Sequence, residues 1–578
     1  MFEFYVKFLR RPLSGTDALV QISGLGLLVG IITGGVILLF RQAIEQPLLH
    51  LLPSQTAEGF ESLPVEIRFA LPLAGALVLG IFLHFMNIGV RKVGVSYVID
   101  RLNNHQGYIS LKSLLVQFFC GVTTILSGQS AGREGPAVHL GSACGSLLGQ
   151  YMRLPNNSIR TLVACGAAAA ISASFNTPVA GVIFAMEVVM MEFTITSFTP
   201  VIVASVSAAI ICQTVYGNAP AFSVGQISLD TLSEIPFILL TGAVVGIAAS
   251  LFVQLIKRYS RFSDRSIIVR LSIAGLVTGL VAMLYPEIMG VGYDTVNTVV
   301  EGKLGLQLLL GVAAAKLFVT AISVGLGVPS GLIGPTLFIG ATLGGACGIL
   351  THLLWPEASS SNSLYVLLGM AAMMGACLQA PLSALLALIE LTYNPHIILP
   401  ALLAIVVASL IASELFGQKS LFVSILQSQG LSLRNDPISN ALRRVSVGAV
   451  MERSLKRCKK FLTLEEATSL LKNQPKWLIV EIDEKPASLL PAADLARQLV
   501  ELNKEDKEQT IDLLAIPAQR KQIQSIYFQA TLREALDRFE ETGAEALYVE
   551  RTSAPMITTL LGVLTREDIN NYYHYKLH

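Results

Sequence analysis

An arginine and a glutamate, Arg133 and Glu134, lie in the glycine-rich stretch SGQSAGREGPAVHLG (127–141), between two apolar runs. Ionisable side chains in apolar surroundings are unfavourable, and within a membrane they mark function by default. Glu134 directly precedes Gly135 and Pro136, and proline suits the first turn of a helix. The pattern predicts a carboxylate at a helix N-terminus, where unpaired backbone N–H groups stabilise negative charge.

A helix N-terminus that holds a carboxylate also suits a free anion. Ionised, Glu134 would occupy the anion site, and protonated, it would swing away and admit the ligand. Glu134 is therefore the predicted gate. The alternative is that Glu134 only caps its helix and pairs with Arg133.

His139, five residues further on, is either a proton relay or a packed and hydrogen-bonded helix residue, as lone histidines usually are. The predicted anion-binding groups are mainly backbone N–H groups at Arg133, Gly135, Leu332, Ile333 and Gly334.

Two pairs of similar segments indicate how these groups are positioned. EGPAVHLGSACGSLLG (134–149) resembles IGPTLFIGATLGGACG (333–348), with glycines five, nine and thirteen residues after each proline. FNTPVAGVIFAME (175–187) and LQAPLSALLALIE (378–390) follow in the same order. Glycines four apart allow close helix contact in lipid, and chance recurrence of small residues is the alternative explanation. The repeat predicts a duplicated transporter-like fold whose broken helices meet near the bilayer midplane.

The composition indicates the class of protein. The chain has 578 residues, of which 53% are hydrophobic and only 14% charged, whereas a soluble domain has about 25% charged residues. Apolar segments follow one another from about residue 20 to 426, which predicts more than ten membrane segments. A net charge of +1 suggests no nucleic-acid partner. The seven scattered cysteines lack metal or disulfide spacing.

These patterns predict four parts of the chain. Residues 1–17 form a cytoplasmic N-terminus. Its basic residues Lys7, Arg10 and Arg11 stay in the cytoplasm, and the membrane span that follows is kept in the mature protein and not cleaved off as a signal peptide. The remaining predicted parts are a transmembrane domain (18–430, with repeats over about 18–215 and 235–430), a linker (431–445) and a charge-rich cytoplasmic α/β domain (446–578).

Three motifs together resemble the CLC family of chloride channels and chloride/proton exchangers: GREGP (132–136), FNTPVAG (175–181) and VPSGLIGP (328–335). The resemblance covers about residues 18 to 430. It implies an α-helical polytopic protein of inverted-repeat CLC architecture, in which Glu134 is the gating residue. It also implies a homodimer with one anion pathway in each subunit, in the plasma membrane or, in a Gram-negative bacterium, the inner membrane.

The sequence departs from the family pattern at several functional positions. Ile333 stands where the family's GxFxP segment usually has Phe. Aligned without gaps, Val93 falls near the position of the usual anion-binding serine, whereas Ser96 would need a three-residue shift, and Phe422 takes the place of the usual tyrosine. Val188 fills the position of the inner proton-transfer glutamate of exchangers, and Glu187 fits the structural acid one residue earlier. These departures favour passive or loosely proton-coupled anion conduction. A proton route through Glu187 or water is the alternative.

The tail resembles a tandem pair of cystathionine-β-synthase (CBS) domains over about 446–500 and 510–575. GVLTREDI (562–569) matches the family's Gly-x-x-Thr-x-x-Asp pattern, in which Thr565 and Asp568 present oxygens to a ribose. The resemblance thus implies an adenine nucleotide (ATP, ADP or AMP). The alternative is a module that only dimerises and stabilises.

Together these features predict a CLC-type transporter of chloride and similar monovalent anions, channel-like or loosely proton-coupled, that requires no cofactor or metal. A strictly coupled chloride/proton antiporter is the first alternative. A nucleotide-sensing regulatory membrane module, with a transmembrane scaffold, is an alternative of another class. A membrane-embedded enzyme is disfavoured because an HExxH motif is absent and no acids are paired at catalytic spacing inside the apolar spans.

Overall fold

The chain forms two compact units: Leu19–Tyr151 with Ile159–Leu433, called the membrane unit, and Arg434–His578 with Met152–Ser158, called the C-terminal unit. The predicted cytoplasmic N-terminus (1–17), including Lys7, Arg10 and Arg11, lies outside the described residues. The computed structural model describes residues 19–576, with gaps at 55, 57, 223, 226, 230, 356–359, 432–436, 484, 502–509 and 555–556.

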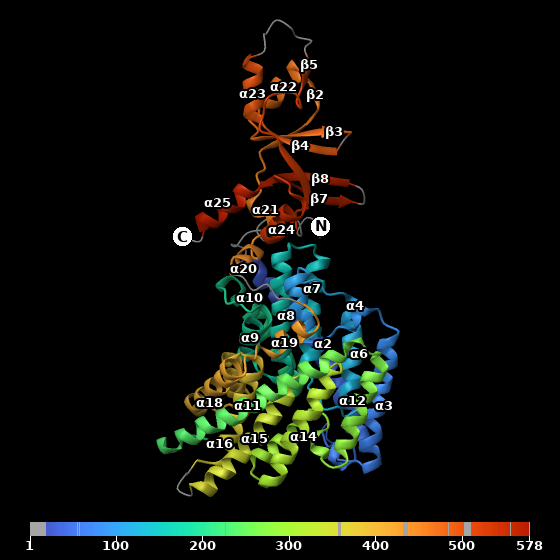
Figure 1. Cartoon of the computed structure of the whole chain (residues 1–578), viewed down its shortest axis with the longest axis vertical. Coiled ribbons are helices and arrows are strands. Elements are labelled where there is room, and N and C mark those ends of the chain that lie inside the picture. The colour runs from blue at the N-terminus through green and yellow to red at the C-terminus, as the bar shows by residue number, and fades with distance from the viewer. Residues whose placement is uncertain are drawn as a thin grey trace. The chain divides into compact units, whose positions relative to one another are not determined.

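The described elements of the membrane unit are all helical (Figure 1). In chain order the main helices are α2 (Leu19–Leu51), α3 (Val65–His84), α4 (Ile88–Arg91), α5 (Val95–Asn104), α6 (Leu111–Leu126), α7 (Glu134–Tyr151), α8 (Asn156–Phe175), α9 (Pro178–Phe184), the π-helix η2 (Ala185–Met190), α10 (Ile195–Tyr216), α11 (Ile235–Ser260), α12 (Ile267–Ala282), α13 (Tyr293–Val300), α14 (Leu306–Gly325), α15 (Ile333–Leu354), α16 (Asn362–Leu378), α17 (Pro381–Thr392), α18 (Ile398–Leu410), the π-helix η7 (Ile411–Leu415) and α19 (Leu421–Ser428).

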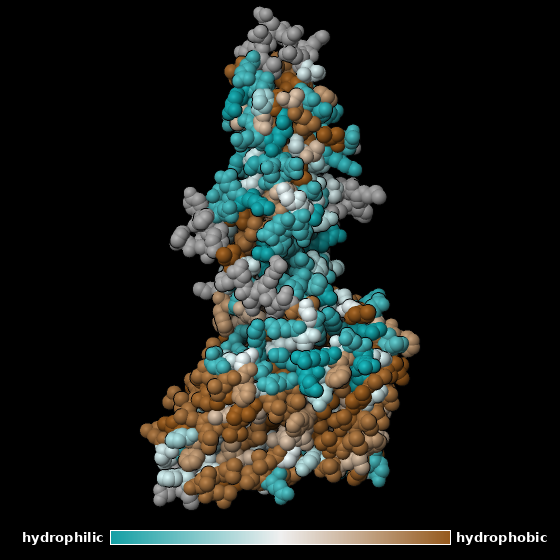
Figure 2. Space-filling model, viewed as in Figure 1, coloured by the Kyte–Doolittle hydropathy of each residue, from teal (hydrophilic) through white to brown (hydrophobic). Residues whose placement is uncertain are grey.

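Eight of the described helical segments are long and apolar enough to cross a membrane, and five shorter apolar segments accompany them. About 20 apolar residues span the hydrocarbon core, so the shorter segments fall short of a full crossing. Two of them, Pro178–Met190 and Pro381–Thr392, begin at the prolines of the second predicted pair of broken helices. Figure 2 shows broad hydrophobic surface over the face of the membrane unit that it presents. The protein is a multi-pass membrane protein.

The internal repeat predicted from the glycine spacing is confirmed in the packing of helix pairs. In the first half α7 packs on α8, where a Cβ at Gly141 would lie 2.2 Å from the Gly166 carbonyl oxygen. In the second half α15 packs on α16, where a Cβ at Gly340 would lie 2.3 Å from the Gly369 carbonyl oxygen. Both crossings therefore require glycine, because the backbones approach too closely for any side chain.

A second pair of equivalent helices is joined by reciprocal caps. Glu187, in η2 directly after α9, accepts hydrogen bonds from the backbone N–H and the hydroxyl of Ser383 (2.7 and 2.6 Å), which belong to the first turn of α17. Glu390, near the end of α17, accepts from the backbone N–H groups of Val179 and Ala180 (2.9 and 2.7 Å), in the first turn of α9. Each carboxylate thus satisfies unpaired N–H groups of the other helix, where the helix dipole favours negative charge.

The C-terminal unit repeats a β-α-β-β-α pattern. Its elements are α20 (Pro437–Arg443), α21 (Val447–Val450), β1 (Leu455–Lys459), β2 (Phe461–Thr463), α22 (Leu464–Leu471), β3 (Trp477–Ile482), β4 (Lys485–Pro491), α23 (Ala492–Glu501), β5 (Thr510–Asp512), β6 (Lys521–Tyr527), α24 (Leu532–Thr542), β7 (Ala546–Ala554), β8 (Ile557–Thr565) and α25 (Arg566–Lys576). The main sheet has the order β1-β3-β4-β6-β7-β8, and β2 pairs with β5.

The two halves of this unit are built from the same local signals. Parallel pairs β1/β3 and β6/β7 are each followed by an antiparallel partner, β4 and β8. The helices between the parallel strands begin with the same capping box, Thr463 with Glu466 in α22 and Thr531 with Glu534 in α24. The matching elements define two similar modules in tandem.

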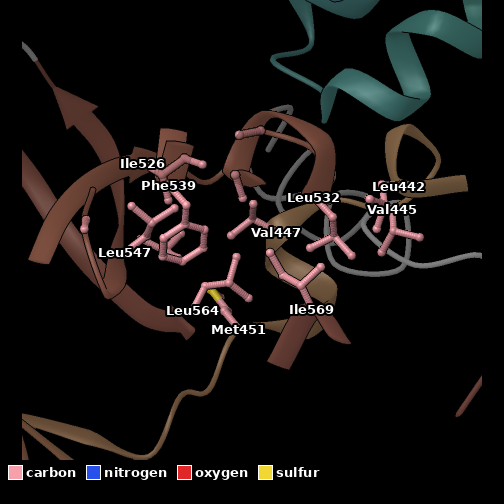
Figure 3. Packing of buried hydrophobic residues seen from close by; sticks show 14 residues of the cluster. Leu442, Val445, Val447, Met451, Ile526, Leu532, Phe539, Leu547, Leu564 and Ile569 are labelled. Carbon is pink, nitrogen blue, oxygen red and sulfur yellow. The ribbon is translucent and has the colours of Figure 1, made fainter. Parts of the chain in front are cut away.

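The core of the second module also contains residues that precede the first (Figure 3). Leu442, Val445 and Val447 pack with Leu532, Phe539 and other residues of the second module. Residues 437–445 of the predicted linker thus form α20 and part of this core, while 432–436 lie outside the described residues.

Candidate functional site

The two glycine-rich loops of the repeat meet in the interior of the membrane unit. Gly132 and Gly331 form an antiparallel bridge, in which each N–H donates to the other's carbonyl oxygen at 2.9 and 2.7 Å. α7 begins two residues after Gly132, and α15 begins two residues after Gly331. Because each loop leads directly into a helix, the bridge brings the N-termini of α7 and α15 together, where unpaired N–H groups favour an anion.

The Glu134 carboxylate lies between these two loops. It is fully buried, and its Oε1 accepts a hydrogen bond from the Tyr293 hydroxyl at 3.0 Å. The backbone N–H of Gly334 also interacts with the carboxylate. The nearest atom to a Cβ built on Gly132 would be Glu134 Oε2, at 2.0 Å. The loop backbone thus leaves room for the carboxylate only because glycine occupies this position.

The remaining predicted anion-binding positions surround the same point. Gly135 packs so closely on the second loop that a Cβ would lie 2.6 Å from the Ser330 carbonyl oxygen. Leu332 and Ile333 are buried where α15 starts, and Leu332 is its N-cap residue. The structure therefore brings the backbones of both predicted segments together around Glu134.

The alternative prediction was that Arg133 pairs with Glu134, but its ion-pair partner is Glu45. Its guanidinium forms an ion pair with Glu45 of α2 (3.2 Å) and donates to the Ser174 carbonyl oxygen (3.3 Å). Glu45 also pairs with Arg41 at 3.1 Å. Among the described residues no ion pair joins Arg133 to Glu134, so Arg133 anchors the loop and leaves the Glu134 carboxylate at the helix ends.

The two positions at which hydroxyl donors were predicted to be missing lie on neighbouring elements. Val93 immediately precedes Gly94, the N-cap residue of α5, and Phe422 is buried in the first turn of α19. α5 and α19 pack against each other. Both side chains are apolar, so neither position donates a side-chain hydrogen bond.

Comparison with known proteins identifies the family. The family model described as "Voltage gated chloride channel" matches residues 74–413. This chain belongs to the CLC family. A ClcB-like protein of Ralstonia nicotianae is 32% identical over 387 residues, which cover 66% of this chain and 90% of the relative. The H(+)/Cl(−) exchange transporter ClcA of Vibrio cholerae (strain M66-2) is 31% identical over 415 residues, or 68% and 86% of the two chains.

Solved CLC structures share the fold at lower identity. A slow cyanobacterial Cl−/H+ antiporter matches with a TM-score of 0.63 and 23% identity, over 72% of this chain and 99% of its own. A eukaryotic CLC transporter matches with a TM-score of 0.60 and 17% identity, over 95% and 98%. The second match extends through the C-terminal unit, whereas the first is limited to about the length of the membrane unit.

His139 is a packed and hydrogen-bonded residue of this CLC protein, as the second of its two interpretations predicted. Its Nδ1 accepts a hydrogen bond from the Gly94 N–H at 3.1 Å, so the proton lies on Nε2, 3.0 Å from the Ser113 hydroxyl. The ring stacks on Tyr97 with centroids 4.9 Å apart. His139 therefore fastens the start of α5 to α7, and both of its nitrogens are used.

The position predicted to correspond to the inner proton-transfer glutamate holds no titratable group. Val188 lies on the π-helix η2 and is 3% exposed. Both carboxylate oxygens of the adjacent Glu187 accept hydrogen bonds from the first turn of α17. Glu187 is thus held in a structural cap.

Thr565 and Asp568 cap α25 by bonding to each other. The Asp568 carboxylate accepts from the Thr565 backbone N–H (2.8 Å) and hydroxyl (2.7 Å), while Thr565 Oγ1 accepts from the Asp568 N–H at 3.2 Å. The predicted oxygen pair is therefore present at the start of a helix, with its hydroxyl proton already committed.

Sequence reasoning missed three residues near Glu134. Lys316 of α14 is fully buried and donates to the carbonyl oxygens of Ile288 and Gly290 at 2.8 and 2.9 Å. As an ionisable residue inside an apolar run, it carried the same signal that singled out Glu134. Tyr293 and Glu58 carried no such signal, because neither lies in a motif or a long apolar run.

Proposed function

We propose that this protein transports chloride and similar monovalent anions across a membrane, gated by Glu134, as a channel or with loose proton coupling. The observation that carries this proposal is the position of the Glu134 carboxylate between the joined N-termini of α7 and α15. A carboxylate in that place occupies the position of a free anion. Protonation removes its charge and its affinity for the helix ends, and so opens the site.

The binding groups are suited to transport. Backbone N–H groups and helix dipoles attract an anion without a full fixed positive charge, so the anion also leaves readily. The Arg133 guanidinium is bound to Glu45, a carboxylate that it shares with Arg41.

Weak coupling to protons is the finer part of the proposal. Tight exchange requires a proton route to Glu134 and a firmly held central anion. Val188 offers no proton, Glu187 is committed to its cap, and Val93 and Phe422 offer no hydroxyl donor. A strictly coupled antiporter is the alternative, and several relatives are named as H(+)/Cl(−) exchange transporters.

Flux from liposomes tests both parts. Purified protein is reconstituted with internal chloride, a potassium ionophore is added, and chloride and pH electrodes record together. We expect chloride release with little or no uphill proton movement. Stoichiometric proton movement would replace the loose coupling with strict exchange, and absence of chloride release would favour the nucleotide-sensing membrane module.

The C-terminal unit is proposed to be a pair of CBS domains that binds an adenine nucleotide weakly through Thr565 and Asp568. Two tandem β-α-β-β-α modules and the match over 95% of the chain to a eukaryotic CLC transporter support this assignment. Calorimetry of the full chain with ATP, ADP and AMP tests it, with Asp568→Asn as the comparison. No heat at millimolar nucleotide would leave only a dimerising and stabilising role.

The family resemblance also suggests a homodimer with one pathway in each subunit. The mass of the protein in detergent, measured by light scattering after gel filtration, tests this assembly. A monomeric mass with full transport activity would contradict it.

A further inference from the structure

We propose that Tyr293 is a ligand of the anion pathway: its hydroxyl latches Glu134 in the closed position and, when Glu134 leaves, donates to the anion that replaces the carboxylate. This inference rests on the proposed gating role of Glu134. The hydroxyl lies 3.0 Å from Glu134 Oε1. Tyr293 is 159 residues away from Glu134 in the chain and outside every motif that indicated the site.

The hydroxyl is held in place from several directions. Gly292, with φ of +84°, turns the chain into α13, and a Cβ there would lie 2.7 Å from the Phe338 ring. The Tyr293 ring contacts Phe222 edge-on, with centroids 5.5 Å apart. Its backbone N–H donates to Glu58 Oε2 at 2.6 Å. A fixed donor of this kind stays in position when the group in front of it changes, as an anion ligand must.

The loop before Tyr293 is fastened to the same region. Lys316 binds the Ile288 and Gly290 carbonyl oxygens, so its ammonium group closes the loop that ends at Gly292. The Arg133 guanidinium lies 5.5 Å from the centroid of the Tyr293 ring. The charged groups that surround the Tyr293–Glu134 pair are Arg133, Glu45, Glu58, Asp294 and Lys316.

The donor set of the site makes this hydroxyl important. Val93 and Phe422 lack hydroxyls, so the site depends on backbone N–H groups and on the one side-chain hydroxyl that bonds to Glu134 among the described residues. Backbone N–H groups of Glu134 and Gly334 also interact with the carboxylate, and the Tyr293 hydroxyl is the side-chain donor to it among the described residues. The same hydroxyl therefore faces any anion that takes the place of the carboxylate.

The latch is tested with Tyr293→Phe, which removes the hydroxyl and keeps the ring. Loss of a donor to the ionised carboxylate favours protonation, so the pH of half-maximal chloride flux should rise by about one to two units. The matched control is Tyr365→Phe, because the Tyr365 hydroxyl also donates to a carboxylate at 3.0 Å, that of Glu234 in another part of the unit. The control should leave the pH curve in place.

The ligand role is tested separately in the Glu134→Gln background, in which the gate no longer titrates. There Tyr293→Phe should raise the chloride concentration for half-maximal flux about tenfold, the effect of one lost hydrogen bond to an anion. An unchanged chloride dependence would overturn the ligand role, and an unmoved pH curve in the otherwise native protein would overturn the latch.

A third variant covers the case in which Tyr293→Phe does not fold. Replacement of Tyr293 by 3-fluorotyrosine keeps the shape of the side chain and makes its hydroxyl a stronger donor, so the pH of half-maximal flux should fall. A rise, or no shift, would contradict the proposal. If the native protein releases no chloride at all, the proposed function has failed before any Tyr293 variant is compared.

Discussion

The two halves of the membrane unit share a scaffold and differ in chemistry. α7 and α15 start after bridged glycine loops and pack on α8 and α16 through equivalent glycines, Gly141 and Gly340. With the prolines aligned, Glu134 of the first half corresponds to Ile333 of the second. Similarly, Arg133 corresponds to Leu332, and His139 to Phe338.

This difference separates two tasks within one site. Backbone N–H groups at a helix N-terminus come from both halves, because any sequence with the required glycines and proline supplies them. The titratable side chains at the site differ between the halves: Glu134 comes from the first, and Tyr293 and Lys316 come from α13 and α14 of the second. The paired helix N-termini are thus a property of the duplicated scaffold, whereas the carboxylate between them is present in one copy.

The largest effect is expected where the halves are most alike. Gly141→Val and Gly340→Val each insert a side chain at a position where even a Cβ would lie within 2.3 Å of a carbonyl oxygen. Overpacking of this severity exceeds the usual penalty of about 1–3 kcal/mol, so both variants should yield little folded protein. Fluorescence-detected gel filtration measures the yield, with Gly24→Val as control because a Cβ there meets nothing within 4 Å. Loss of folded protein in only one of the two variants would show that the α7–α8 and α15–α16 crossings are not equivalent.

The second effect is expected where the halves differ. Glu134→Gln removes the titrating group, so chloride flux should become nearly independent of external pH, whereas native flux should rise about tenfold or more on acidification. The counterpart Ile333→Val should alter the rate and keep the native pH dependence. Liposome efflux across a series of external pH values measures both. Native pH dependence in Glu134→Gln would place the gate elsewhere.

The reciprocal caps give a smaller, symmetric effect. Glu187→Gln and Glu390→Gln each replace charge-assisted hydrogen bonds with neutral ones, and each should lower stability by about 1–3 kcal/mol. Thermal unfolding in detergent compares the two, with the exposed Glu414→Gln as control. Unequal losses would indicate that one carboxylate has a task besides capping. A change in proton coupling in Glu187→Gln would identify that task.

The smallest effect concerns Glu58, in the loop between α2 and α3. Burial raises the pKa of its carboxyl to about 7, against the opposing effect of Arg133. Below pH 7 the group is therefore mostly neutral, and above pH 7 its charge repels an anion near Tyr293. In the Glu134→Gln background, Glu58→Gln should increase flux about two- to threefold at pH 8 and leave it nearly unchanged at pH 5.5. The exposed Glu66→Gln is the control, and an equal gain at both pH values would contradict the titration.

The sequence alone determined the membrane class, the broken helices and the position of the Glu134 carboxylate at a helix N-terminus. Each of these depends on local chemistry: apolar length, a proline in the first helical turn, and glycines at helical spacing. The repeat of these signals in EGPAVHLG and IGPTLFIG made the duplicated fold predictable. The same reasoning singled out Glu134, because an acid among glycines in an apolar run has few structural uses.

Only the tertiary structure decided which side chains surround that carboxylate. Arg133 pairs with Glu45, 88 residues earlier, and Tyr293 reaches Glu134 across 159 residues. Glu187 and Glu390 cap helices about 200 residues away from themselves in the chain. These partners are set by how distant helices pack, and local sequence patterns carry no information about such contacts. For this reason the hydroxyl that faces the Glu134 carboxylate was found in the fold.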